Sequence, residues 1–217
     1  MRITPLVQAV FWMAAAWECV CAQTPLSVVV FNYAGVSHAD ISGAVSTAFW
    51  AYHAAGIATA WPVCDVSSKD TETCNQPIPA DGRYLELDVM PRRAKTLDVR
   101  LTSGEPAGLA LVGREFIRPR AYVFLAATKD AADFAVRPLD VVLGCVLVHE
   151  SGHLLGLGHQ PRGVMRAQID AHDVDAAVSG HPFGLGEIQQ LQRTVNGAKR
   201  MAAGGGTVLA SRARIGK

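Results

Sequence analysis

The stretch Val148-His149-Glu150-Ser151-Gly152-His153-Leu154-Leu155-Gly156-Leu157-Gly158-His159 decides how this chain folds around one site. On a helix, residues four apart share a face, so His149 and His153 can direct two imidazoles at one metal ion. Gly156 lets the chain leave the helix, because glycine enters left-handed backbone conformations without a steric cost. The turn brings His159 back as a third nitrogen ligand. Three neutral imidazoles leave a fourth position open, as in a catalytic rather than a structural zinc site.

Glu150 directly follows the first histidine. It is near enough to a bound metal to take a proton from a water there, without being a ligand itself. The alternative for a bare H-E-x-x-H is two surface histidines beside a helix-favouring glutamate. Here the extended form H-E-x-x-H-x-x-G-x-x-H is complete, and it follows the apolar run 141–148. We therefore expect a zinc site on a helix that begins at Pro138-Leu139-Asp140, where proline and an acid suit a first turn.

A methionine turn is expected after the motif, at Gly163-Val164-Met165. The long histidine motif and this methionine together resemble the metzincin clan of zinc peptidases. The resemblance implies an α/β (α+β) zincin fold with a twisted mixed sheet, an antiparallel edge strand, an active-site helix, a methionine turn and a C-terminal helix. It also implies that the three histidines of the motif hold Zn2+, that Glu150 is the general base, and that Met165 forms the hydrophobic base of the site.

The flanking sequence extends the resemblance over most of Leu26 to Asn196. The segments 30–36, 61–74 and 163–167 are similar to a group of exported, matrixin-like bacterial proteins. Two positions depart from the families of the clan. Gln160 follows the third histidine, and Ala167 stands where astacin-like enzymes carry a tyrosine that reaches the metal. We therefore expect no tyrosine ligand.

Alternating strand and helix patterns before the motif predict an α/β domain. A β-branched run at 27–32 predicts a strand, and apolar residues at helical spacing over 40–55 predict a helix that ends at Gly56. Further strands are predicted at 57–63, 84–89, 107–112 and 120–126, and a last helix is predicted at 186–196.

The N-terminal segment has the features of a secretory signal peptide. Arg2 precedes an almost wholly apolar run from Pro5 to Trp17, and small residues precede a predicted cut after Ala22. The alternative, a membrane anchor, needs about 20 apolar residues, more than this run supplies. We expect a signal peptide at 1–22, a metzincin-like catalytic domain at 23–197 and a flexible basic tail at 198–217. The mature protein is then secreted or periplasmic, without stable membrane insertion.

The composition fits one globular domain. Of 217 residues, 50% are hydrophobic and 18% are charged, which is enough for a real core. The formal net charge of +1 gives no strong attraction to nucleic acid or to an anionic membrane. We therefore expect no nucleic-acid partner. We also expect a monomer.

Three cysteines remain after the predicted cleavage. Cys64 and Cys74 bracket a polar loop, and export permits a disulfide between them. The alternative, a second metal site, lacks histidines and a short C-x-x-C spacing. Cys145 lies one helical turn before His149. We interpret it as a buried small hydrophobe, and a thiol switch on the zinc is the alternative.

Two hypotheses for the function follow. The favoured one is a zinc endopeptidase that hydrolyses peptide bonds with a zinc-activated water, Glu150 being the general base. Its substrate would be a peptide or protein in extended conformation, paired with the edge strand near 107–112. The other hypothesis is a non-catalytic zinc-binding or protein-interaction domain on the same fold. The intact Glu150 favours the enzyme, because a degenerate site would be free to lose that residue first.

Overall fold

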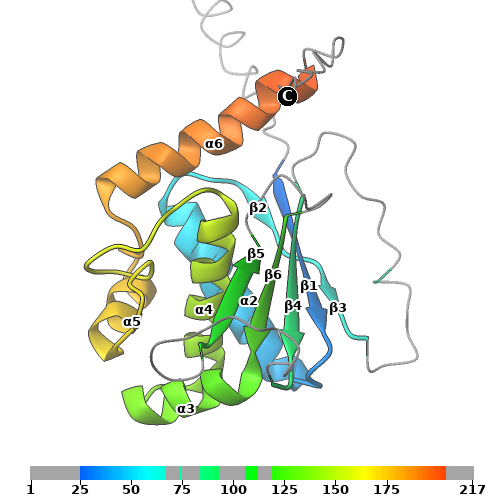
Figure 1. Ribbon diagram of the computed structural model, residues 1–217, viewed down its shortest axis with the longest axis vertical. Coiled ribbons are helices and arrows are strands. Elements are labelled where there is room, and N and C mark those ends of the chain that lie inside the picture. The colour runs from blue at the N-terminus through cyan, green and yellow to red at the C-terminus, as the bar shows by residue number, and fades with distance from the viewer. Residues whose placement is uncertain (1–24, 67–73, 75–83, 93–105, 112–118, 204–217) are drawn as a thin grey trace, which may run out of the picture.

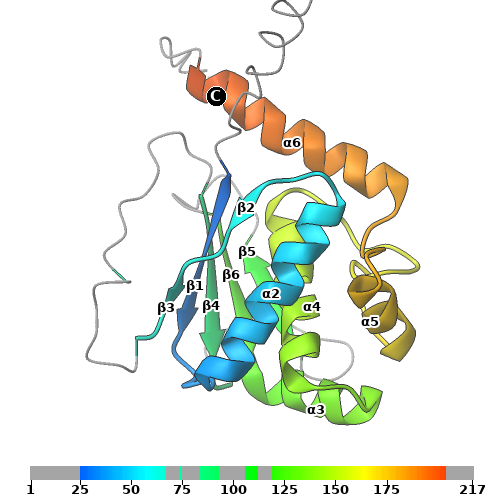
Figure 2. The same ribbon diagram turned by 180° about the vertical axis from the view of Figure 1, so that it is seen from behind.

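The computed structural model describes residues 25–66, 74, 84–92, 106–111 and 119–203. These residues form a six-stranded sheet and five helices. Helices α2 (His38–Ala54) and α4 (Leu139–Leu154) lie side by side against one face of the sheet (Figures 1 and 2). The predicted α/β class is confirmed. The predicted signal peptide lies outside the described residues.

The sheet has the strand order β2-β1-β4-β6-β5, and β3 also pairs with β1. The only antiparallel pair among the described strands is β5 with β6. The predicted mixed sheet with an antiparallel edge strand is therefore confirmed, and β5 is that strand. The strand bounds are β1 (Leu26–Asn32), β2 (Thr59–Ala60), β3 (Val63–Cys64), β4 (Tyr84–Met90), β5 (Gly108–Leu111) and β6 (Arg120–Phe124).

The two faces of the sheet differ because successive side chains of a strand point to opposite sides. On β4, Leu85, Leu87 and Val89 belong to the core that the helices complete. Glu86 and Asp88, which alternate with them, are buried on the other face. Both carboxylates pair with Arg120 of β6. A buried acid is tolerated there because a cation accompanies it.

Glycines allow α2 and α4 to approach closely. A Cβ on Gly144 of α4 would lie only 2.7 Å from the backbone oxygen of Ala44 on α2. A Cβ on Gly43 of α2 would lie 2.8 Å from the Cβ of Asp140 on α4. Any larger residue at either position would push the helices apart. The glycines thus set the depth at which α4, and the motif on it, sits in the domain.

A hydrogen bond between buried hydroxyls holds the same two helices together within the motif. Ser151 Oγ lies 2.7 Å from the carbonyl oxygen of Leu147, which can only accept. The hydroxyl of Tyr52 on α2 lies 2.8 Å from Ser151 Oγ, so the tyrosine is the donor of that pair. Ser151 lies two residues from both His149 and His153, so this bond anchors α4 on the side of the helix opposite these histidines.

The cysteines are arranged as predicted. Cys64 at the end of β3 forms a disulfide with Cys74, with the two Cα atoms 4.8 Å apart. Cys145 is free and buried. Burial raises the pKa of the Cys145 thiol to about 12, so it stays protonated and unreactive. This favours a small hydrophobe over a thiol switch.

Some boundaries differ from the prediction. The predicted strand at 57–63 is two short strands, β2 and β3, around Trp61 and Pro62. The predicted strand at 120–126 ends at Phe124, and α3 (Leu125–Ala135) begins at the next residue. The sequence does not show this boundary, because the first residues of α3 are apolar like those of the strand. Helix α5 (Ala171–Val178) was not predicted, and α6 (Leu185–Ala203) runs into the predicted tail.

The missed helix α5 depends on its cap. Asp170 and Asp173 form a reciprocal capping box, and two aspartates at the start of so short a segment look like a loop in the sequence.

None of the helices in the described part of the chain has the length and apolar character needed to cross a bilayer.

We predict that Val136→Asn stabilises the protein. Val136 ends α3 with a φ of +52°, and its side chain is 81% exposed. A β-branched residue is strained in this left-handed conformation, which asparagine tolerates, so the free energy of unfolding should rise by about 1 kcal/mol. Urea unfolding measures this change. Val178→Asn is the control, because Val178 is also exposed and is the last residue of α5 but does not have a positive φ. An equal change in the free energy of unfolding of both variants would contradict the explanation.

Candidate metal centre

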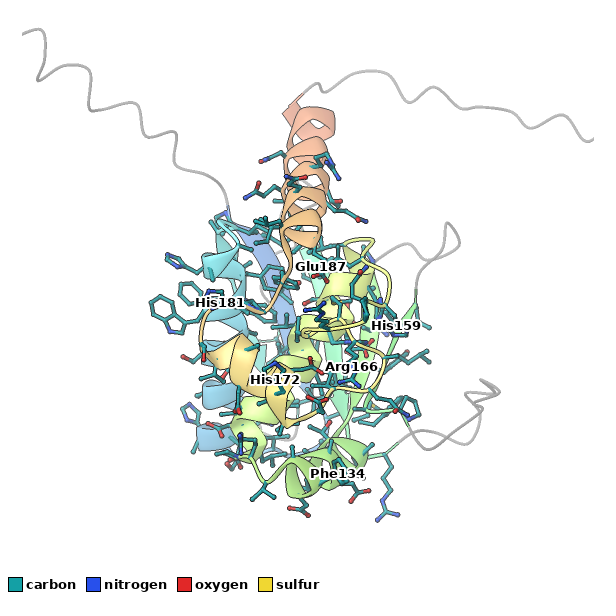
Figure 3. The ribbon with its side chains drawn as sticks, turned by 90° about the vertical axis from the view of Figure 1, so that its left-hand side faces the viewer. Phe134, His159, Arg166, His172, His181 and Glu187 are labelled. Atoms are coloured by element: carbon teal, nitrogen blue, oxygen red, sulfur yellow. A yellow bond between two sulfur atoms is a disulfide. The ribbon has the colours of Figure 1, made fainter. Side chains whose placement is uncertain are left out.

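Helix α4 and the loop after it carry the whole histidine motif. His149 and Glu150 lie in the buried part of α4, and His153 lies in its last turn. Gly156 has a φ of +88°, which takes the chain out of the helix as expected, and His159 follows in the loop (Figure 3). His153 Nε2 lies 3.0 Å from His149 Nε2 and 3.2 Å from His159 Nε2. The three rings therefore converge.

The spacing of the nitrogens fits one tetrahedral metal ion. Zinc–nitrogen bonds of about 2.0–2.1 Å at tetrahedral angles place two ligand nitrogens about 3.3 Å apart. The two measured separations, 3.0 and 3.2 Å, are close to this value. Among the described residues, these three histidines are the group whose ligand atoms lie within 4.8 Å of one another. The group could hold a zinc ion.

Backbone carbonyls determine which ring nitrogens face the centre. His149 Nδ1 lies 2.8 Å from the Val164 oxygen, and His153 Nδ1 lies 2.8 Å from the Leu157 oxygen. A carbonyl only accepts, so each Nδ1 carries the hydrogen and each Nε2 presents a lone pair. Two lone pairs 3.0 Å apart repel each other unless a proton or a cation lies between them. The ring orientations are thus those of a cation site.

The histidines are in the state that a metal needs. Burial is the main cause that lowers the pKa of His149 to about 4. The neighbouring His153 and His159 add to this effect, and the hydrogen bond to Val164 opposes it. Burial also lowers the pKa of His153. Both rings are therefore neutral at pH 7, with their lone pairs free for coordination.

Glu150 is buried beside this group with one oxygen free. The residue is only 4% exposed, and its Oε2 has no hydrogen-bond partner. Burial raises the pKa of its carboxyl to about 8. A cation at the histidines would act in the opposite direction and favour the carboxylate. An unpartnered buried acid is costly, which indicates a use for the free oxygen.

Gly108 of the edge strand makes the room for this carboxyl group. A Cβ at Gly108 would lie 2.3 Å from Glu150 Oε1 and 2.5 Å from its Cδ. The acid of α4 thus touches the backbone of β5 directly. Sequence reasoning missed Gly108, because nothing in the sequence places this glycine against a residue of the distant helix.

Met165 is buried and packs against the histidine motif at Gly152. It is 0% exposed, and a Cβ at Gly152 would lie 2.6 Å from its sulfur. Gly152 stands between the paired histidines of the motif, so it is the position where the helix admits the methionine. The turn is closed by the amide of Arg166, which donates to the Gly163 oxygen at 3.0 Å. Gly163 has a φ of +78°, which explains the glycine there.

The structure brings the three predicted metal-binding histidines together, whereas the disulfide and the remaining histidines lie elsewhere. The Cys64–Cys74 disulfide belongs to β3, which pairs with β1 toward the sheet edge opposite β5. The histidines without ligand spacing do not join the group: His38, His53, His172 and His181. Figure 3 shows His172 and His181 away from His159. Asp173, which holds the methionine turn, was also missed, because it follows the motif as one acid among several.

No family model matches this chain, and no curated protein matches it. Among solved structures, the chain is similar to the crystal structure of archaemetzincin from Methanopyrus kandleri. The two share 19% sequence identity with a TM-score of 0.48, over 82% of this chain and 99% of that chain.

We predict that Gly108→Ala destabilises the metal-free protein by about 1–3 kcal/mol, because the added methyl group overlaps the Glu150 carboxyl. The penalty should largely vanish in a Glu150→Ala background, where that space is empty. Urea unfolding of the two single variants and the double variant measures this coupling. Gly186→Ala is the control, since a Cβ there meets nothing within 4 Å. A penalty that is the same with and without Glu150 would show that the contact is not responsible.

Proposed function

We propose that the protein is a zinc-dependent endopeptidase of the metzincin clan, in which His149, His153 and His159 hold Zn2+ and Glu150 is the general base. One observation carries the proposal: Glu150 Oε2 is buried and unpartnered beside three converging imidazoles. A purely structural zinc site does not need such an acid. The fit of the nitrogen spacing and the enforced tautomers support zinc as the cofactor.

When bound, zinc supplies a Lewis acid that polarises a carbonyl group and acidifies a water molecule. Glu150 accepts the proton of the attacking water at its free Oε2. It then returns this proton to the leaving amine as the peptide bond breaks. Burial raises the pKa of the Glu150 carboxyl, which makes it a stronger base toward the attacking water in the first step.

The edge strand is the proposed site for the substrate backbone. β5 pairs with β6 on one side, and no other described strand pairs with it. On this proposal an extended peptide adds to the outer edge of β5 as a further strand. Because Glu150 touches Gly108 at the start of β5, a peptide on this edge passes next to the acid.

We also propose that the chain is exported and acts as a monomer on peptide or protein substrates. The disulfide between Cys64 and Cys74 supports an oxidising compartment. The competing function is a zinc-binding or interaction domain without catalysis. Cleavage of a mixed peptide library by the zinc-loaded protein distinguishes the two.

We expect Glu150→Gln to lower the rate of peptide cleavage by about 10²- to 10⁴-fold, because the amide cannot accept the proton. Zinc content, measured by elemental analysis, should stay near one per chain, since no ligand is removed. Asp133→Asn on the exposed end of α3 is the matched control and should cleave like the wild type. Undiminished turnover in Glu150→Gln would refute the role of Glu150.

X-ray absorption on the zinc-loaded protein should show imidazole nitrogens at about 2.0–2.1 Å and no sulfur scatterer. Met165 is buried against Gly152 as packing, and its thioether is a soft donor poorly matched to this site. Ala167 has no donor atom. His159→Ala should remove one imidazole from the shell. A sulfur in the first shell of the wild type would show that the centre is built differently.

A further inference from the structure

We propose that Asp173 of α5 is a positioning residue of the metal centre: it holds the methionine turn (163–166), which in turn orients His149 and places the chain at His159. The inference rests on the zinc site proposed above, and not on peptide cleavage. Asp173 lies outside the motif and is not part of the group of three histidines.

Two carbonyl groups of the methionine turn support two of the three ligands. The Val164 oxygen accepts the hydrogen of His149 Nδ1 at 2.8 Å. The Met165 oxygen accepts the backbone amide of Gln160 at 2.9 Å, directly after His159. Any shift of the turn therefore moves the ring of the first ligand and the backbone of the third together.

The start of the turn is attached to Asp173. The amide of Gly163 donates to Asp173 Oδ1 at 2.9 Å. A second backbone contact at this end of the turn is the amide of Val164, which donates to the Pro182 oxygen at 3.2 Å. The bond to Asp173 is shorter and its acceptor is a carboxylate, so it is the stronger of the two. Asp173 is therefore the stronger of the two backbone anchors at the start of the turn.

Asp173 is itself held firmly. It is 3% exposed, and its Oδ2 accepts the amide of Asp170 at 3.2 Å as part of the capping box. The guanidinium of Arg166 lies 3.3 Å from the same oxygen and also pairs with Asp170. Figure 3 shows Arg166 beside the loop that carries His159. Oδ2 thus serves the helix cap and the arginine, while Oδ1 reaches out of the helix to the turn.

This division of the two oxygens makes Asp173→Asn an informative variant. An asparagine has one acceptor oxygen and one amide group. Two donors, the Asp170 amide and Arg166, face the Oδ2 position, so the oxygen of the asparagine is best placed there. Its NH2 group then faces the Gly163 amide, donor against donor. The variant keeps the shape of the side chain and the cap but loses the bond to the turn.

The experiment compares zinc binding in folded, purified variants. Zinc affinity is measured by competition with a chelator, and coordination by the visible spectrum of the cobalt-substituted protein. We expect Asp173→Asn and Asp173→Ala to weaken zinc binding about 10- to 100-fold, the range seen when outer-shell partners of ligands are removed. The cobalt spectrum should change as well, because the ring of His149 is no longer held.

Two controls separate positioning from helix stability. Asp175→Asn removes an exposed carboxylate of the same helix, which pairs with Arg137 and not with the turn. It should leave zinc affinity and the cobalt spectrum unchanged. Asp170→Ala removes the other half of the capping box and the pair with Arg166, but it keeps the bond between Asp173 and the Gly163 amide. It should weaken zinc binding less than Asp173→Ala does.

The inference would be overturned if Asp173→Asn had the same zinc affinity and the same cobalt spectrum as Asp175→Asn. An equal loss in Asp170→Ala and Asp173→Ala would also overturn it, because fraying of α5 or loss of the Asp170–Arg166 pair would then explain the effect without the bond to Gly163. A wild-type protein that binds no zinc would contradict the proposed function itself. Tight zinc binding without peptide cleavage would refute only the catalytic part, and the role of Asp173 would stand.

Discussion

The hydrogen bond from His149 Nδ1 to the Val164 carbonyl is the contact on which the centre depends. It joins α4 to a turn that follows the third histidine. It fixes the tautomer, so that the Nε2 lone pair of His149 faces the other two rings. The Leu157 carbonyl accepts a hydrogen bond from His153 Nδ1 and fixes the tautomer of that ring in the same way. The convergence of the nitrogens is therefore a property of the backbone around them, and a free helix with the same histidines would lack it.

The packing of α4 explains why this helix can carry buried polar groups. It is buried along most of its length, from Val142 to Gly152. Glycines set its distance from its neighbours on three sides: Gly144 faces α2, Gly152 faces Met165, and Gly108 of β5 receives Glu150. Each close contact excludes water from the motif. The raised pKa of Glu150 and the lowered pKa of His149 are the electrostatic consequences of that exclusion.

The short helix α5 adds a second layer of support. It is stabilised by its own capping box, and the same aspartate that completes the box reaches the methionine turn. Helix stability and the geometry of the centre are thus coupled through one side chain. Arg166 supplies the positive charge that a buried carboxylate requires. The turn, the cap and the ligands form one hydrogen-bonded unit.

The sequence by itself determined the local chemistry. The spacing of His149 and His153 on a helix, the break at Gly156, the strands at β1, β4 and β5, and the Cys64–Cys74 pair all follow from short-range patterns and appear in the structure. Only the tertiary structure decided the contacts of Gly108 with Glu150 and of Asp173 with Gly163. It also decided where β6 gives way to α3, because an apolar run does not say which backbone conformation it takes. These features depend on contacts between segments that are distant in the sequence, and the periodicity of residues along the chain does not predict such contacts.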